Sequence, residues 1–358
     1  MDMSSPLPFV PDPQRSPFIA FWETTRACDL ACLHCRACAI PVRHPLELST
    51  EEGKRLLLEL KEMGCPVVVI TGGDAAKRPD LVPLIEYGNS VGLRMALTPS
   101  ATPLVTADLL KELQDAGLQR VAISLDGAQS VTHDRVRGFL GAYDNGLRLL
   151  SEAGNIGLPT QVNTTITPDN VHEMEDIAHL IGAFGVSLWS VFCLVPTGRA
   201  EGQIMFDRAQ MEEALNRLAA IAEDAPFDIK TTEAQHYRRV LLQRKHRRKI
   251  IGAGGIGRVP RGINDGKGVV FVSHIGDVYP SGFLPIACGN VRKERLSDIY
   301  REHAIFKTLR DTDKLGGKCG VCEFRHVCGG SRARAYAVTG DMMAEEPTCA
   351  YTPSAMLH

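Results

Sequence analysis

Short apolar runs alternate along the first two thirds of the chain with segments whose apolar residues recur at helical spacing. The runs are four to ten residues long, which is the length of buried β-strands, and the segments between them are long enough for helices of several turns. This alternation predicts a parallel sheet whose strands are connected by helices. The predicted strands are 18–24, 66–70, 94–97, 119–125, 160–167 and 186–195, and the predicted helices are 50–63, 80–91, 107–116, 141–153, 170–183 and 208–223.

The number of repeats indicates an α/β fold with a partial, TIM-like (β/α)6 barrel, because six repeats are fewer than a complete TIM barrel needs. Ser49, followed three residues later by Glu52, predicts a capping box at the start of the first helix. In parallel sheets of this kind, functional residues lie at the carboxyl ends of the strands. We therefore expect a site directly after the predicted strands.

The last third of the chain has a different character. Residues 236–249 form a basic run, and a glycine-rich stretch follows it. The GAGGIG within this stretch follows no predicted strand and opens no predicted helix, so we do not interpret it as a dinucleotide-binding loop. A β-hairpin from Val269 onward and a short helix at 295–308 precede a cysteine-rich end. The expected parts are an N-terminal tail (1–16), a core domain (17–232), a basic and glycine-rich linker (233–260) and a small C-terminal domain (261–358).

Charge and composition exclude several classes of protein. Forty Lys and Arg residues stand against 42 Asp and Glu, which argues against a nucleic-acid partner. The longest apolar stretch, at 186–196, is too short to cross a membrane, and residues 1–16 do not have the pattern of a signal peptide. We therefore expect a cytoplasmic protein. Eleven cysteines in such a chain are more often metal ligands or reactive groups than disulfides.

A first group of cysteines follows the first predicted strand directly. Cys28, Cys32 and Cys35 offer three thiolates, a donor set that selects zinc or an iron–sulfur cluster. Structural zinc takes four ligands, and Cys38 could complete a tetrad, so the spacing alone leaves zinc open. A [4Fe–4S] cluster held by three cysteines would instead leave one iron open to another ligand.

The segment CDLACLHC resembles the CxxxCxxC motif of the radical S-adenosylmethionine (SAM) enzymes. Further motifs match this family in order at the predicted strand ends: TGGD (71–74), SLDG (124–127), an asparagine on the fifth strand and LVPTGR (194–199). The resemblance covers residues 17 to about 230. It implies Cys28, Cys32 and Cys35 as catalytic cluster ligands, and a SAM site formed by His34, Gly72, Gly73, Asp74, Ser124, Asp126, Asn163, Val195 and Pro196.

The chemistry that the resemblance implies is the reductive cleavage of SAM. The open iron chelates SAM, an electron from a reductant such as flavodoxin or ferredoxin breaks the S–C5′ bond, and the resulting 5′-deoxyadenosyl radical abstracts a hydrogen from the substrate. His34 is expected against the adenine or in a structural role, and Cys38 is expected to pack locally. Ala75 and Ala76 stand where the family has a Pro-Leu pair, which leaves the shape of that loop open.

A second group of cysteines near the C-terminus resembles the SPASM extension of many radical SAM enzymes. Full versions hold two auxiliary [4Fe–4S] clusters, but here Ser281, Ser331 and Arg332 occupy positions where ligands of the first would stand. We therefore expect one auxiliary [4Fe–4S] cluster, with structural zinc as the alternative and Cys288 as a possible stray ligand. The expected ligands are Cys319, Cys322, Cys328 and Cys349.

Within the SPASM group, the chain is most similar to the branch that modifies side chains of haem-type tetrapyrroles. The shared stretches include WETTRACDLACLHCRA and CGVCEFRHVCGG, whereas TPSAT (98–102) departs from the usual turn. A polycarboxylate substrate should bind to cations, and we expect Arg238 and Arg239 in this role with His236 as a ligand to haem iron, although the basic run could simply be a solvated helix face. The alternatives are maturation of a ribosomally made peptide, for which no leader-recognition domain is found, and an electron carrier, which leaves the SAM motifs unexplained.

Overall fold

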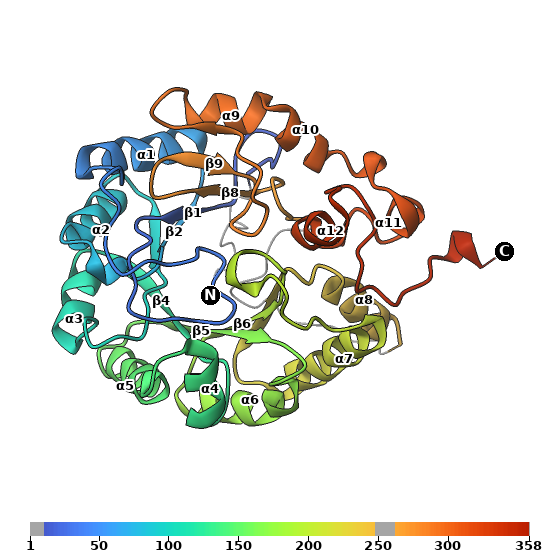
Figure 1. Cartoon of the computed structure of the whole chain (residues 1–358), viewed down its shortest axis with the longest axis horizontal. Helices are drawn as coiled ribbons and strands as arrows, with labels where there is room; N and C mark the ends of the chain where they lie inside the picture. Colours follow the sequence, from blue (N-terminus) through green and yellow to red (C-terminus); the bar gives the residue numbers. More distant parts are fainter. Residues whose placement is uncertain (1–10, 248–261, 358) are drawn as a thin grey trace, which may run out of the picture.

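One sheet organises the molecule (Figure 1). The structure, a computed structural model, describes residues 11–247 and 262–357. The strand order is β10-β9-β8-β1-β2-β3-β4-β5-β6-β7. The strands are β1 (Ile19–Glu23), β2 (Val67–Thr71), β3 (Arg94–Leu97), β4 (Leu118–Ser124), β5 (Thr160–Ile166), β6 (Leu188–Cys193), β7 (Asp228–Thr232), β8 (Val269–Val272), β9 (Asp277–Tyr279) and β10 (Gly289–Asn290).

Helices surround the sheet on its outer side (Figure 1). All the predicted helices of the first two thirds are present within a few residues of the expected bounds, and α4, α8, α11 and α12 are additional. The helices are α1 (Thr50–Met63), α2 (Leu81–Ser90), α3 (Ala107–Asp115), α4 (Ser130–Arg137), α5 (Ala142–Asn155), α6 (Met174–Ala183), α7 (Arg208–Asp224), α8 (Tyr237–Arg247), α9 (Leu296–Glu302), α10 (Ala304–Arg310), α11 (Gly317–Val321) and α12 (Arg332–Thr339).

The predicted α/β class and partial barrel are confirmed. Strands β1 to β7 run parallel in chain order, and β8 runs parallel to β1 on its other side. The sheet therefore contains the six predicted strands, β1 to β6, and continues beyond them with β7 at one edge and with β8, β9 and β10 at the other. Strand β7 was missed because its sequence DIKTT contains a single apolar residue, Ile229, and so lacks the pattern of a buried strand.

The two faces of the barrel strands differ in their packing. Side chains on the outer face pack beneath the helices and are fully buried, as Trp22 and Trp189 show. Trp22 lies so close to α1 that a Cβ atom on Gly53 would be 2.3 Å from its ring. The predicted capping box at Ser49 and Glu52 fixes the start of that helix. The outer core thus holds the strands in place, while the inner face remains available for polar side chains.

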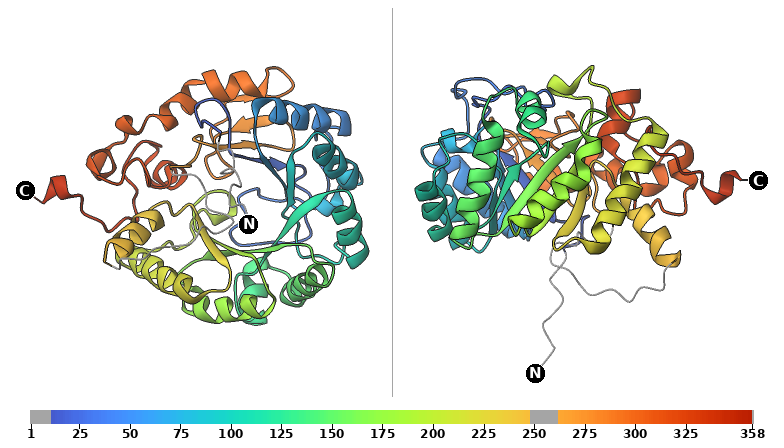
Figure 2. Two further views of the ribbon diagram at one scale, coloured as in Figure 1. Left: turned by 180° about the vertical axis from the view of Figure 1, so that it is seen from behind. Right: turned by 90° about the horizontal axis from the view of Figure 1, so that it is seen from below.

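The C-terminal third is continuous with the barrel. The predicted hairpin is present as β8 and β9, and β8 pairs with β1, so the sheet crosses the domain boundary expected at residue 261. The predicted helix 295–308 is divided into α9 and α10 at His303, which has extended backbone angles and caps α10 with its side chain. Figure 2 shows the last helices beside α7 and α8 at one side of the barrel.

The expected linker 233–260 is partly helical. Helix α8 occupies residues 237–247, whereas the glycine-rich stretch with GAGGIG lies outside the described residues, as do residues 1–10 of the expected tail. Residues 11–16 pack on the C-terminal region, where the Tyr300 hydroxyl donates a hydrogen bond to the carbonyl of Pro13 at 2.8 Å. In the described part of the chain, no helix is long and apolar enough to span a membrane.

Candidate functional site

The loop after β1 carries the first group of cysteines and is held at both sides by backbone hydrogen bonds. The amide of Cys28 donates to the carbonyl of Ile40 at 2.8 Å, which closes the loop on itself. The amides of Ala31 and Leu33 donate to the carbonyls of Arg137 and Val136, at 3.1 and 2.9 Å. The end of α4 therefore fixes the cysteine loop above the ends of the strands.

Hydrogen-bond donors point at the cysteine sulfurs. The amide of Leu30 donates toward Cys28 Sγ at 3.4 Å, and the Arg137 guanidinium lies 3.7 Å from Cys32 Sγ. The Ser100 hydroxyl, which donates to the carbonyl of Gly73 at 2.8 Å, lies 3.3 Å from Cys28 Sγ. Burial raises the pKa of Cys28 despite these contacts. At Cys35 burial also raises the pKa, but hydrogen bonding to Arg199 and to backbone amides outweighs it, so the pKa of this thiol is lowered. Such donors stabilise thiolates, the form that binds metal.

Cys38 stands apart from these contacts. Its backbone has a left-handed φ of 46°, and its carbonyl accepts a hydrogen bond from Arg26 at 2.7 Å. Across residues 11–247 and 262–357, no three His, Cys, Asp or Glu side chains are arranged as a site for a single metal ion. The donor set of Cys28, Cys32 and Cys35, with cations and amides around it, fits a polynuclear iron–sulfur group better than zinc.

Gly72 and Gly73 allow the β2 loop to approach the cysteine loop. The amide of Gly73 donates to the carbonyl of Thr25 at 2.7 Å, and the amide of Asp74 donates to the carbonyl of Ala27 at 2.6 Å. A Cβ atom at either glycine would lie 2.5 Å from one of these carbonyl oxygens. Close backbone packing is therefore the role that the structure shows for the two glycines, and contact with SAM stays a prediction.

Asp74 is fully buried and connects this loop to the turn after β3. Its carboxylate accepts hydrogen bonds from the Thr102 hydroxyl at 2.7 Å and from the amides of Ser100 and Ala76 at 3.3 and 3.1 Å. Burial raises its pKa. The unexpected Ala75 and Ala76 form a short 3-10 helix, Ala75–Lys77, that Asp74 caps. Ser100 and Thr102 belong to the TPSAT turn, and their place directly after a strand was the available signal for a role in the site.

Asp126 is the centre of a buried charge network. Its carboxylate accepts from Arg137 at 2.6 Å, from His34 Nε2 at 3.1 Å and from the amide of Thr165 at 2.8 Å. Burial raises the pKa of Asp126, but the charge of Arg137 and the contact with His34 outweigh burial and hold the pKa well below its usual range. Arg137 thus joins Asp126 to Cys32, a role that sequence reasoning missed.

The remaining predicted SAM-site residues lie on neighbouring strand ends. Ser124 and Asn163 are paired in register across β4 and β5, on the inner face of the sheet. The side chain of Val195 is buried in a core cluster shared with the C-terminal region, and half-buried Pro196 follows it, so SAM contact by either residue stays a prediction. Two residues further on, a Cβ atom on Gly198 would lie 2.7 Å from the carbonyl of Cys35. The segment after β6 therefore also packs on the cysteine loop.

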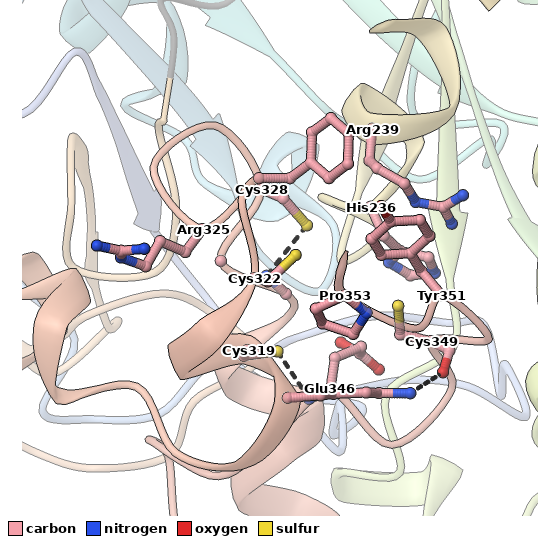
Figure 3. Close-up of a pocket in the computed structure, with 14 residues that line it drawn as sticks. His236, Arg239, Cys319, Cys322, Arg325, Cys328, Glu346, Cys349, Tyr351 and Pro353 are labelled. Atoms are coloured by element: carbon pink, nitrogen blue, oxygen red, sulfur yellow. Dashed lines mark hydrogen bonds between the residues drawn. The ribbon is translucent and has the colours of Figure 1, made fainter. Parts of the chain in front are cut away.

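The second group of cysteines lines one cavity (Figure 3). The amides of Glu346 and Gly330 donate to Cys319 Sγ and Cys328 Sγ, at 3.3 and 3.4 Å. Four thiols around one cavity are a donor set that an iron–sulfur cluster or a zinc ion can use. The cysteines are Cys319, Cys322, Cys328 and Cys349.

Cysteines outside these two groups are part of the protein core. Cys65, Cys193 and Cys288 belong to the main hydrophobic cluster, and burial raises the pKa of each to about 12. The idea that Cys288 is a stray ligand therefore has no support. Ser331, at a position where SPASM domains have a cysteine, accepts a hydrogen bond from the amide of Arg334 at 2.9 Å and caps α12.

Arg334 is fully buried and joins the C-terminal cavity to the barrel. Its guanidinium donates to the carbonyls of Cys193 and Leu194, at the end of β6, at 3.0 and 3.1 Å. It also pairs with Glu346 at 3.1 Å. Burial raises the pKa of Glu346, but the charge of Arg334 outweighs burial and lowers this pKa to about 2. The cavity that holds the second cysteines is thus fixed to the carboxyl end of a barrel strand.

Of the three residues predicted to bind substrate, His236 and Arg239 line this cavity and Arg238 does not. His236 is 1% exposed, burial lowers its pKa to about 4, and neither ring nitrogen has a hydrogen-bond partner among the described residues. Arg239 pairs with Glu212 at 2.7 Å, and Arg238 donates to the carbonyl of Val327 at 3.0 Å. Because both arginines already have protein partners, their expected role in binding carboxylates gains no support from the structure.

Comparison with known proteins agrees with this geometry. Residues 22–181 match the Radical SAM superfamily. The chain is 40% identical over 340 residues to the AdoMet-dependent heme synthase of Nitratidesulfovibrio vulgaris, covering 94% of this chain and 92% of the relative. It is 36% identical to the AdoMet-dependent heme synthase of Methanosarcina barkeri, covering 94% and 97%. The crystal structure of Streptococcus suis SuiB bound to precursor peptide SuiA is similar in fold, with a TM-score of 0.71 at 15% identity over 96% of this chain and 76% of that one. The chain is therefore a radical SAM enzyme and belongs to the same family as the AdoMet-dependent heme synthases.

Proposed function

We propose that this enzyme forms haem, or a haem-like product, by modifying carboxylate side chains of an iron-tetrapyrrole precursor. The observation that carries the proposal is the similarity to AdoMet-dependent heme synthases over 94% of the chain. This similarity spans both the barrel and the C-terminal cysteine cavity. A likeness to SuiB at 15% identity concerns the fold alone, so it does not favour a peptide substrate.

In this proposal Cys28, Cys32 and Cys35 hold a [4Fe–4S] cluster that supplies one-electron cleavage of SAM when both are bound. The chain's own residues hold the three thiolates in place. Leu30 and Arg137 donate toward the sulfurs, and the loops after β2 and β6 fix the backbone around them. Asp126 holds His34 and Arg137 in position beside the cysteine loop. SAM is proposed to bind where the strand ends after β2, β4, β5 and β6 meet this loop.

We further propose that the C-terminal cysteines hold one auxiliary [4Fe–4S] cluster. Their common cavity and the amide donors at Cys319 and Cys328 support this. Anaerobically reconstituted protein should then contain about eight irons per chain, by the stoichiometry of two such clusters. The variant Cys319→Ser/Cys349→Ser should keep about half of that iron. Zinc bound at the C-terminal cysteines of the wild type would contradict the proposal.

The test of the proposed function is a coupled turnover assay. Reconstituted enzyme, SAM and a reductant are incubated without oxygen with iron coproporphyrin III, an iron porphyrin with propionate side chains. Mass spectrometry should show a porphyrin of altered mass together with 5′-deoxyadenosine in a fixed ratio. The variant Cys28→Ala/Cys32→Ala/Cys35→Ala should form neither product. Formation of 5′-deoxyadenosine with no change in the tetrapyrrole would refute the proposal and would favour the alternative of a peptide substrate.

The proposed partners and location follow from this chemistry. A flavodoxin or ferredoxin is proposed as the electron donor. None of the eleven cysteines forms a disulfide, and chains of this kind are typical of reducing compartments. We therefore place the enzyme in the cytoplasm.

A further inference from the structure

Two cations lie on the inner face of the barrel, away from both groups of cysteines. Arg120 is on β4, where its neighbours Val121 and Ile123 point into the outer core, so Arg120 points inward. Lys230 is on β7 and pairs in register with Ser190 of β6, whose neighbours Trp189 and Val191 are likewise in the outer core. Both side chains are half-buried.

In the described part of the chain, neither cation is fixed in an ion pair. Among residues 11–247 and 262–357, no hydrogen bond or ion pair is made by the Arg120 or Lys230 side chain. Burial, and then the charge of Arg120, lower the pKa of Lys230 to about 8. The other charged groups around Arg120 are Asp228, a carboxylate on β7, and Arg94, a further cation on β3. Arg94 is exposed at the start of β3, so Arg120 and Lys230 are the two half-buried cations of this group.

The rest of the inner face is partly aromatic. Phe21 on β1 and Phe192 on β6 are half-buried, and Phe192 lies 6.2 Å from the ring of Phe283, centroid to centroid. Aromatic rings of this kind pack well against a flat aromatic ligand. A half-buried cation without a counter-ion is unfavourable, and an anionic ligand removes both the repulsion and the desolvation cost. The surface therefore suits an aromatic ligand that carries acids.

We propose that Arg120 and Lys230 bind carboxylate side chains of the substrate and so orient the tetrapyrrole inside the barrel. The proposal rests on the proposed function, and it replaces the expectation that Arg238 and Arg239 serve this purpose. An arginine can bind a carboxylate with two parallel hydrogen bonds, and a lysine adds a point charge, so together they can hold two acids at separate positions.

The test measures binding of iron coproporphyrin III to the cluster-loaded enzyme, followed by the Soret band. Arg120→Gln and Lys230→Gln should each weaken binding by about 10-fold to 100-fold, the effect of losing one charge-assisted hydrogen bond. Lys230→Arg should restore most of the affinity. The matched control Lys111→Gln/Lys307→Gln also removes two positive charges, but from side chains that are 54% exposed on the outside, and should bind as the wild type does.

The outcomes separate this inference from the proposed function. If the wild type does not bind the iron porphyrin, the proposed function fails. If the wild type binds and Arg120→Gln/Lys230→Gln binds equally well, the inference fails while the proposed function stands. A general loss of structure is detected by measuring SAM binding and circular dichroism of the double variant, which should match the wild type. If the double variant loses SAM binding to the same extent as porphyrin binding, the inference is also overturned, because the two residues would then be structural.

Discussion

Replacing Arg137 by glutamine should strongly destabilise the enzyme. Arg137 provides the positive charge beside Asp126, whose side chain is 0% exposed. Within residues 11–247 and 262–357, the other hydrogen-bond partners of this carboxylate are His34 and the amide of Thr165. Removing one partner of a buried ion pair costs about 3–5 kcal/mol, because the other charge stays buried without compensation. Domains are stable by about 5–15 kcal/mol, so Arg137→Gln should fold but with little margin.

The assay is denaturant unfolding of cluster-free protein, which separates stability from cluster loading. Arg135→Gln is the control, because Arg135 lies on the same helix, is 55% exposed and makes one long ion pair with Asp169 at 3.8 Å. Its loss should change the free energy of unfolding by less than about 1 kcal/mol. A loss for Arg137→Gln as small as that of the control would show that Arg137 does not compensate Asp126.

A second variant tests the two roles of Arg137 separately. Arg137→Gln/Asp126→Asn removes both charges and should recover most of the lost stability, because no uncompensated charge remains. It does not restore the donor that lies 3.7 Å from Cys32 Sγ. We therefore expect iron content after reconstitution to stay below that of the wild type even though the fold has recovered. Full recovery of both quantities would refute a role for Arg137 at the cysteine loop.

Three further changes test other contacts of the site. Gly73→Ala should lower iron content and SAM cleavage, measured by iron analysis and 5′-deoxyadenosine release, because the added Cβ atom would lie 2.5 Å from the carbonyl of Ala27. Arg334→Met should lower the free energy of unfolding by about 3–5 kcal/mol and increase protease cleavage near α12, since it leaves Glu346 buried without its partner. Lys230 has a pKa of about 8, below its usual 10.5, so the unfolded chain binds more protons between these values. The free energy of unfolding should therefore rise with pH across that window, and porphyrin affinity should fall as pH rises through about 8, whereas Lys230→Met should show neither trend.

The sequence predicts those parts of the fold whose cause is local. The first six strands have an apolar outer face, and the spacing of their residues reveals them. Strand β7 does not, because both of its faces are only half-buried. The pairing of β8 with β1 joins residues that are far apart along the chain, so no local pattern contains it.

In the candidate site too, the sequence predicts features that have a local pattern and not those that depend on contacts between distant residues. The cysteines and Asp74 could be found because their spacing after a strand is a local property. Arg137 could not be assigned from spacing, because its partner Asp126 is brought to it by the packing of α4 over the ends of β4 and β5. Two adjacent arginines, Arg238 and Arg239, are typical of an anion-binding site. In the structure, however, Arg238 donates to the carbonyl of Val327 and Arg239 pairs with Glu212, and both partners lie on other elements.

The place of β1 in the sheet affects how the enzyme is made. β1 lies between β2 and β8, and Ile19 pairs with Val269, which the ribosome adds 250 residues later (269 − 19 = 250). Until β8 has emerged, the strand that carries the cysteine loop has an unpaired edge, and such edges are prone to wrong pairing. The barrel is therefore completed only after synthesis is nearly finished, and a chain that ends before β8 exposes the edge of β1. We therefore expect metal insertion at the first cysteines to be a late step of biogenesis, measurable as low iron content in a chain truncated before β8.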